Sequence, residues 1–523
     1  MEIKVQKKYL TLPVNKARSK KKLCFYCNGE LVYDLDVHLD NLAPTFTSYV
    51  DVSRFYGQEL TLTVEPQMPL CIGEADEMEL QGLYEEPMRP LVHFTVKNGW
   101  NNDPNGLCFH NGVYHMFYQY NPCDIHWGNM HWGHATSRDL IHWEEQDVKL
   151  FPDAHGTEYS GCAFTDSENR SGLGSKEAPP LLFYYTAAGG ESRLSKDHLY
   201  TQRLAYSLDN GNTLIKHPDC ILEHIVACNR DPKVVYVAEI SSHVMILYLE
   251  KGEFALFSSN DLYRWTLFQR LTIRNDGECP NLVRVPIKNS TEHRWVIFGA
   301  TGIYTVGSFV DGQFVPEQDA YRASTESRWY AGQCFHNADE VIVIDWLRTQ
   351  AVESRFSQAM GIPCRLELEN AYDRLWLTKT PIDALQALAV TDESPTSPLC
   401  DDTSLTIPLT QKAYDISLTA DYDEENSLTL SLFGQSIAID MHKNQVSVGK
   451  NACTLSLDRK RVSLRIIVDT TSVEIFADGG RFNFAAAVLS DHNLMYAMLS
   501  AEKPLKNASL SVRGLKSIWN QKG

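Results

Sequence analysis

The sequence predicts an all-β protein, and three observations lead to this fold class. Long amphipathic helical patterns are nearly absent, and the clearest helical candidate, residues 381–390 (PIDALQALAV), is short. A loose internal repeat in the middle of the chain is typical of stacked β units. Finally, Asn-Gly or Asp-Gly pairs separate short apolar or alternating runs, as two-residue hairpin turns do. These pairs are Asn28-Gly29, Asn111-Gly112, Asp311-Gly312 and Asp478-Gly479.

The first 85 residues are predicted to form a separate N-terminal β module. Residues 30–40 (ELVYDLDVHLD) and 49–64 (YVDVSRFYGQELTLTV) alternate apolar and polar side chains, as half-buried strands do. This segment contains no tryptophan, whereas nine of the ten tryptophans lie between Trp100 and Trp376. Residues 85–90 (EEPMRP) have the composition of a linker.

The middle segment, residues 90–390, carries the repeat. Residues 137–143 (SRDLIHW) recur as 259–265 (SNDLYRW), with a partial copy at 207–211 (SLDNG). The gaps suit the blades of a β-propeller, each of about 40 to 50 residues or more. Coincidence within an all-β chain is the alternative.

Residues 400–523 alternate again and are predicted to form a C-terminal β-sandwich. Examples are residues 427–440 (SLTLSLFGQSIAID) and 462–479 (VSLRIIVDTTSVEIFADG). Residues 392–402 (DESPTSPLCDD) have the composition of a second linker.

The charge balance bears on the choice of partner. With 48 Lys and Arg against 66 Asp and Glu, the net charge is −18. This argues against nucleic acid or an anionic membrane surface, since both require basic patches, and it is compatible with a neutral sugar. An acidic surface that serves only solubility is the alternative.

The N-terminus (MEIKVQKKYLTLPV) has no apolar core of a signal peptide, and no stretch reaches the roughly 18 apolar residues of a membrane span. We therefore expect a cytoplasmic protein in which the 13 cysteines are reduced thiols. The single Cys24-x-x-Cys27 lies in a strand-like run, which favours a structural role over zinc or redox work.

Three acids stand in similar settings. Asp103 lies in residues 99–106 (GWNNDPNG), Asp231 in 229–233 (NRDPK) and Glu278 in 276–281 (DGECPN). A proline follows each acid by one or two positions and favours an extended residue before it, which suits a strand end. A propeller gathers strand ends around one channel, so the three segments are expected to converge. Taken singly, each motif also fits an ordinary turn.

Five blocks together resemble glycoside hydrolase family 32, which contains the invertases, levanases and inulinases. In order they are WNNDPNG, FYQYNP, WGHATSRDLIHW, RDPKV and ECPNL, and the resemblance covers residues 90–385. It implies a five-bladed β-propeller catalytic domain followed by a β-sandwich, and an extra N-terminal β module as in some bacterial fructan-degrading members.

The resemblance also implies residue roles. Asp103 would be the nucleophile, Asp231 the transition-state stabiliser and Glu278 the general acid/base. Hydrolysis with retention needs one carboxylate to attack and a second to protonate the leaving oxygen. A third anion can favour the oxocarbenium-like transition state. Residues expected to bind the substrate are Asn102, Gln119, Trp127, Ser160 and Arg230, with Trp329 and Tyr330 lining the entrance.

The chain departs from the family pattern beside these acids. Gly277 and Asn229 stand where many relatives have an aromatic residue, and Asn281 stands where Asp is frequent. These positions bear on the substrate subsites and not on the reaction.

The sequence therefore predicts a retaining β-fructosidase that releases terminal fructose from fructans, fructo-oligosaccharides or sucrose. No metal-binding or phosphate-loop motif is present, so we expect no cofactor. The alternatives are a fructosyltransferase, a catalytically inactive fructan-binding protein and an inverting, arabinan-type hydrolase. A homodimer is possible. The linkage, the chain length and phosphorylation of the sucrose stay open.

Overall fold

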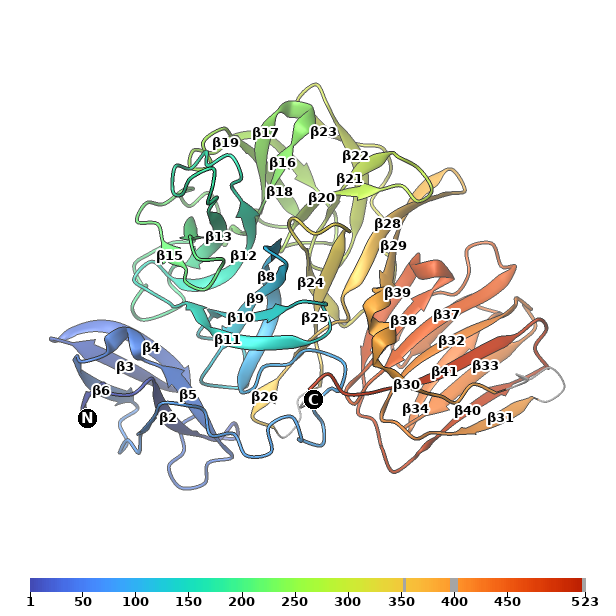
Figure 1. Cartoon of the computed structure of the whole chain (residues 1–523), viewed down its shortest axis with the longest axis horizontal. Helices are drawn as coiled ribbons and strands as arrows, with labels where there is room; N and C mark the ends of the chain where they lie inside the picture. Colours follow the sequence, from blue (N-terminus) through green and yellow to red (C-terminus); the bar gives the residue numbers. More distant parts are fainter. Residues whose placement is uncertain (351–353, 396–402, 520–523) are drawn as a thin grey trace.

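The computed structural model describes residues 1–350, 354–395 and 403–519, and it confirms the all-β prediction (Figure 1). The helices in these ranges are four short 3-10 turns, and none is long and apolar enough to cross a membrane. They are η1 (Ser53–Phe55), η2 (Ala238–Ile240), η3 (Asp383–Leu388) and η4 (Asp478–Gly480). The predicted helix at 381–390 is thus the 3-10 turn η3, whose Leu385 and Leu388 are buried at the i, i+3 spacing of that helix type.

Three of the four predicted two-residue turns are confirmed. Asn28, Asn111 and Asp311 have φ near +50°, and the glycine after each has φ near +80°. Positive φ at both positions is the signature of a type I′ hairpin turn. The fourth prediction is wrong, because Ala477 pairs with Phe482 and residues 478–481, including η4, form a longer connection.

The first 75 residues form two antiparallel sheets around one apolar core. They are called the N-terminal sheets below, and they lie beside the middle of the chain (Figure 1). The first sheet has the order β1 (Glu2–Lys4), β6 (Glu59–Glu65), β3 (Lys21–Cys27), β4 (Glu30–Val37), and the second the order β5 (Phe46–Asp51), β2 (Tyr9–Val14), β7 (Gly73–Ala75). Burial alternates strictly along β6, which is the pattern predicted from the sequence.

Five sheets follow in chain order. The first contains β8 (Gly99–His110), β9 (Val113–Asn121), β10 (His131–Ser137), β11 (Trp143–Leu150) and β26 (Phe356–Ser357). The second contains β12 (Thr157–Thr165), β13 (Leu181–Ala188), β14 (Thr201–Ser207) and β15 (Ile215–Lys216). The third contains β16 (Arg230–Val237), β17 (Ser242–Tyr248), β18 (Glu253–Ser259) and β19 (Thr266–Thr272).

The fourth sheet contains β20 (Asn281–Pro286), β21 (His293–Phe298), β22 (Tyr304–Val310) and β23 (Gln313–Pro316). The fifth contains β24 (Trp329–Cys334), β25 (Ile342–Leu347), β27 (Ala359–Met360), β28 (Cys364–Ala371) and β29 (Arg374–Pro381). The leading strands of these sheets touch in a closed cycle: β8 contacts β12, β12 contacts β16, β16 contacts β20, β20 contacts β24, and β24 contacts β8.

The sequence repeat is confirmed as a recurring turn. Each copy follows the third strand of its sheet, namely β10, β14 and β18. A serine hydroxyl lies 2.8–3.2 Å from the aspartate carboxylate two residues later in all three copies: Ser137–Asp139, Ser207–Asp209 and Ser259–Asp261. The aspartates also accept backbone N–H groups, so the motif holds the connection to the fourth strand.

The C-terminal residues form two six-stranded sheets over a common core, as expected for the predicted sandwich. One has the order β30 (Ala389–Asp392), β41 (Ser509–Leu515), β32 (Ala413–Asp421), β37 (Arg461–Val468), β38 (Ser472–Ala477), β39 (Phe482–Ala487). The other has the order β31 (Ser404–Pro408), β40 (Tyr496–Ala501), β33 (Ser427–Leu432), β34 (Gln435–Asp440), β35 (Gln445–Val448), β36 (Asn451–Thr454). Most of the predicted second linker, residues 396–402, lies outside the described residues.

Candidate active site

The three predicted acids lie at the beginnings of three leading strands. Asp103 is the fifth residue of β8, Asp231 is the second residue of β16, and Glu278 precedes β20 by three residues. Because all three strands belong to the closed cycle of leading strands, their first residues meet at one mouth of the ring. Segments separated by more than 40 residues of sequence are thereby brought into contact.

Cys279 joins the acids directly. Its backbone N–H donates to Oδ2 of Asp231 at 2.9 Å. Its thiol lies 3.4 Å from Oδ2 of both Asp103 and Asp231. The nucleophile candidate and the stabiliser candidate therefore contact the same side chain, next to Glu278 in the sequence.

Arg230 supplies the positive charge of the cluster. Its Nη2 donates to Oε2 of Glu278 at 2.5 Å, and its Nε lies 3.6 Å from Oδ2 of Asp231. One guanidinium therefore faces two carboxylates and offsets part of their mutual repulsion.

Polar side chains hold Asp103 in place. The hydroxyl of Ser160 donates to Oδ2 of Asp103 at 2.7 Å, and Nε2 of Gln119 donates to the Ser160 hydroxyl oxygen at 3.1 Å. Asn102 is buried, and its Oδ1 accepts the indole N–H of Trp100 at 2.9 Å. The structure thus brings four predicted site residues, Asp103, Asn102, Gln119 and Ser160, into one contiguous group.

Trp127 lies in the loop between β9 and β10 and is 46% exposed. Its ring packs edge-on against Tyr159, with 6.0 Å between the ring centroids. Tyr159 directly precedes Ser160, so Trp127 lies at the border of the cluster and presents an apolar face to solvent.

Trp329 is the predicted site residue that the structure does not bring to the acids. Its ring is 7% exposed, its N–H donates to Oε1 of Glu474 at 2.8 Å, and the Lys379 ammonium lies 3.6 Å from the ring centre. The prediction that Trp329 binds substrate is therefore not supported by its position, which is a packing contact with the C-terminal sheets. Its neighbour Tyr330 points the other way and donates its hydroxyl proton to Oε1 of Glu278.

Two acids adopt a backbone conformation that the sequence argument did not anticipate. Proline was expected to make Asp231 extended, yet φ is +66° at Asp231, +44° at Glu278 and +43° at Cys279. This left-handed region costs non-glycine residues roughly 1–3 kcal/mol and is found where the surrounding structure holds a functional group in place. Backbone hydrogen bonds supply this support, because the N–H of Asp231 donates to Thr186 and that of Cys279 donates to Asp231.

Burial sets the protonation behaviour of the cluster. It raises the pKa of Asp103, the charge of Glu278 adds to the effect, and the Ser160 hydrogen bond opposes it. The pKa of Asp231 is raised to about 7, first by burial and then by Glu278 and Asp103, against the opposing charge of Arg230. Burial and the same acids raise the pKa of the Cys279 thiol well above its ordinary value, so that it is a neutral thiol and not a nucleophile.

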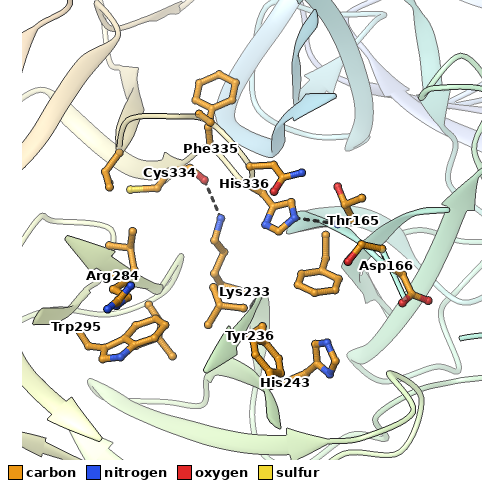
Figure 2. A pocket seen from close by; sticks show the side chains of 18 of the residues that line it. Thr165, Asp166, Lys233, Tyr236, His243, Arg284, Trp295, Cys334, Phe335 and His336 are labelled. Carbon is orange, nitrogen blue, oxygen red and sulfur yellow. Dashed lines mark hydrogen bonds between the residues drawn. The ribbon is translucent and has the colours of Figure 1, made fainter. Parts of the chain in front are cut away.

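A separate cavity of about 660 Å³ is lined by residues of the leading strands β12, β16, β20 and β24 (Figure 2). Its lining includes Thr165, the last residue of β12, and Cys334, the last residue of β24. Lys233 stands in it and donates to the carbonyl oxygen of Cys334 at 2.8 Å. The acids are not among its lining residues, so this cavity is distinct from the cluster.

One group in the described ranges brings three potential metal-ligating side chains together. Atoms of His38, Asp124 and His126 lie within 4.8 Å of one another. Nδ1 of His38 is already hydrogen-bonded to Oδ2 of Asp124. This pair joins the loop between β9 and β10 to the N-terminal sheets. The group is therefore accounted for as a structural contact.

Comparison with known families decides the class of the chain. Residues 93–380 match the model "Glycosyl hydrolases family 32 N-terminal domain", and residues 385–513 match "Glycosyl hydrolases family 32 C terminal". The chain belongs to glycosyl hydrolases family 32. It is a glycoside hydrolase, and the resemblance predicted from the five sequence blocks is confirmed.

Relatives of this family 32 hydrolase align along most of its length. The extracellular exo-inulinase of Aspergillus niger is 27% identical over 84% of this chain and 96% of its own. The levanase of Bacillus subtilis is 28% identical over 83% of this chain and 72% of its own. The crystal structure of exo-inulinase from Aspergillus awamori is similar with a TM-score of 0.73 and 24% identity, covering 83% of this chain and all of that one, which supports the fold.

Proposed function

We propose that this family 32 hydrolase releases terminal β-D-fructofuranosyl residues from fructans, fructo-oligosaccharides or sucrose with retention of configuration. The observation that carries the proposal is the cluster in which Cys279 and Arg230 tie Asp103, Asp231 and Glu278 together. Relatives named exo-inulinase, levanase and invertase support fructosides as the substrate class.

Each acid has a role that follows from its surroundings. Asp103 attacks the anomeric carbon, and Ser160 orients its carboxylate. Glu278 protonates the leaving oxygen and then removes a proton from the water that cleaves the fructosyl-enzyme. Asp231, held beside Arg230, stabilises the positive charge that develops on the fructose ring.

Polar and aromatic neighbours then position the sugar. Asn102, Gln119 and Arg230 offer hydrogen bonds to its hydroxyl groups, while Trp127 offers an exposed ring face. Asn102 is already hydrogen-bonded to Trp100, Gln119 to Ser160 and Arg230 to Glu278, so little ordering of these side chains is required when the sugar binds.

The test is a product analysis with the purified protein on sucrose, inulin, levan and short fructo-oligosaccharides. Release of free fructose together with the substrate shortened by one unit, which is glucose in the case of sucrose, supports exo-hydrolysis, and proton NMR should detect β-fructofuranose first. Release of short fructo-oligosaccharides from inulin or levan from the start contradicts exo-action, and first-formed α-fructose contradicts retention.

A fructosyltransferase is the second candidate, because a sugar hydroxyl can replace water at the same intermediate. The exposed Trp127 provides a surface on which an acceptor sugar can lie. Formation of longer fructosides at high sucrose concentration distinguishes the two activities.

We further propose that the five middle sheets are the blades of a propeller. The closed cycle of contacts among β8, β12, β16, β20 and β24 supports this arrangement. The division into residues 1–85, 90–390 and 400–523, the cytoplasmic location and the homodimer stay predictions. Cell fractionation and light scattering test the last two.

A further inference from the structure

We propose that the N-terminal sheets clamp two loops at the mouth of the ring and thereby set the preference for the part of the substrate beyond the terminal fructose. The first is the Trp127 loop, residues 122–130 between β9 and β10, and the second is the Glu191 loop, residues 189–200 between β13 and β14. This inference rests on the proposed function and gives the N-terminal sheets a positioning role in it.

The Trp127 loop is bound to the N-terminal sheets along its length. Asn129 and the backbone of Asp36 exchange two hydrogen bonds, of 2.7 and 2.8 Å. The Ser48 hydroxyl donates to the carbonyl oxygen of Pro122 at 3.0 Å. Cys123 is fully buried in the apolar core of the N-terminal sheets. The loop that carries Trp127 is therefore part of their packing and not a free surface loop.

The Glu191 loop is held by two carboxylates of the N-terminal sheets. Asp34, whose side chain is 1% exposed, accepts the backbone N–H groups of Arg193 and Leu194, each at 3.0 Å. The Arg193 guanidinium forms a two-pronged pair with Glu65, at 2.8 and 2.6 Å. Such a planar double contact fixes direction as well as distance.

An aromatic wall connects the two loops next to the acids. Trp127 packs on Tyr159, and Tyr159 packs on Tyr200 with 5.6 Å between ring centroids. The Tyr200 hydroxyl donates to Oε1 of Glu191 at 2.7 Å. Since Glu191 is exposed, its carboxylate can accept further hydrogen bonds from sugar hydroxyl groups.

The aromatic wall of Trp127, Tyr159 and Tyr200 borders the acid cluster on the side of Ser160. Tyr159 precedes Ser160, which donates to Asp103. Burial raises the pKa of the Tyr159 hydroxyl, and the charges of Glu191, Arg230 and Asp231 also contribute to the shift. The terminal fructose is held mainly by strand residues that belong to the middle sheets, and the Trp127 ring borders it. Sugar units beyond it meet Trp127, Tyr159 and Glu191, whose loops are anchored in the N-terminal sheets. Loosening the clamp should therefore affect longer substrates while leaving the chemistry intact.

The experiment compares Asp34→Ala with Glu30→Ala, a matched change on the exposed β3–β4 turn of the same sheets. For Asp34→Ala we expect kcat/KM on a fructan to fall about fivefold or more, mainly through KM, with hydrolysis of an aryl β-fructofuranoside unchanged within about twofold. Glu30→Ala should match the wild type on both substrates.

A second variant and a measurement independent of activity complete the experiment. Arg193→Gln, which acts from the loop side and leaves the N-terminal sheets intact, should shift selectivity in the same direction if Asp34→Ala folds poorly. Hydrogen–deuterium exchange should become faster in residues 189–200 of both variants, a readout independent of activity. Faster exchange with unchanged selectivity, or equal loss on both substrates, overturns the inference. A wild-type protein that cleaves no fructoside contradicts the proposed function instead, while unchanged exchange in both variants contradicts the clamp by itself.

Discussion

The hydroxyl of Tyr330 donates a hydrogen bond to Oε1 of Glu278, although 52 residues separate them in the sequence. Trp329, the preceding residue of β24, points to the opposite side and donates to Glu474. Successive side chains of a strand alternate in direction, so only one of this pair can reach the acids. The acid/base candidate thus has two donors, Tyr330 and Arg230.

Tyr330→Phe should lower kcat by about tenfold or more with little change in melting temperature, because it removes a donor to Glu278 and keeps the ring. Trp329→Phe is the matched change. It should lower the melting temperature with little change in kcat, since it removes the buried hydrogen bond to Glu474 and leaves the acids untouched. Steady-state kinetics and thermal melting of both variants check this. A normal rate in Tyr330→Phe would show that the hydrogen bond does not serve catalysis.

Asp103→Asn should lower kcat by more than about a thousandfold, because an amide cannot form the fructosyl-enzyme. Its melting temperature should not fall, since burial already raises the pKa of Asp103 and so disfavours its charged form. Asp209→Asn, in the turn after β14, is a suitable control that should remain active. Residual activity above about a tenth of the wild type would remove Asp103 from the nucleophile's role.

Asp231→Asn should be more stable than the wild type at pH 8 and equally stable at pH 4. The pKa of Asp231 is raised from 3.8 to about 7, so the folded state binds its proton more tightly than the unfolded state. The stability that this confers on the wild type is lost as the pH rises from 3.8 to 7, whereas Asn carries no charge at any pH. The full difference is at most about 4 kcal/mol, at 1.36 kcal/mol for each pKa unit. Melting curves at pH 4, 6 and 8 check this, and a difference that stays constant with pH would contradict it.

His93 joins the middle sheets to the C-terminal sheets. Its two ring nitrogens lie 2.8 Å from Asp469 and 3.2 Å from Glu474, and all three side chains are fully buried. Burial opposes the charged imidazolium, but the two carboxylates outweigh it and raise the pKa of His93 to about 10.

Because the folded-state pKa exceeds the unfolded value of 6.5, the stabilisation from His93 is complete below pH 6.5 and is lost as the pH rises to about 10. His93→Gln should therefore lower the melting temperature by several degrees at pH 6 and by less at pH 10. Thermal melting at both values measures the effect. A penalty that grows with pH would show that His93 is neutral in the folded protein.

Much of this protein follows from local sequence. Alternation of apolar residues predicts strands, and Asn-Gly or Asp-Gly pairs predict type I′ turns, because few residues tolerate positive φ at both positions. The prediction of a two-residue turn is wrong for the fourth pair, Asp478-Gly479, because the same dipeptide also fits a longer turn. The S-x-D repeat predicts equivalent turns because its hydrogen bonds are made within a few residues. The acid motifs are equally local, and together with the blocks FYQYNP and WGHATSRDLIHW their order predicts the family.

The tertiary structure decided what depends on distant contacts. It selects Tyr330 over Trp329 because the direction of β24 follows from its place in the ring. It gives Asp231 a positive φ against the preference set by Pro232, because Thr186 and Cys279 hold it in the cluster. It also ties the N-terminal sheets to the mouth of the ring through Asp34 and Asn129, residues with no motif around them. Sequence patterns record the conformational preferences of neighbouring residues, whereas these contacts join residues far apart in the chain and exist only once the chain has folded.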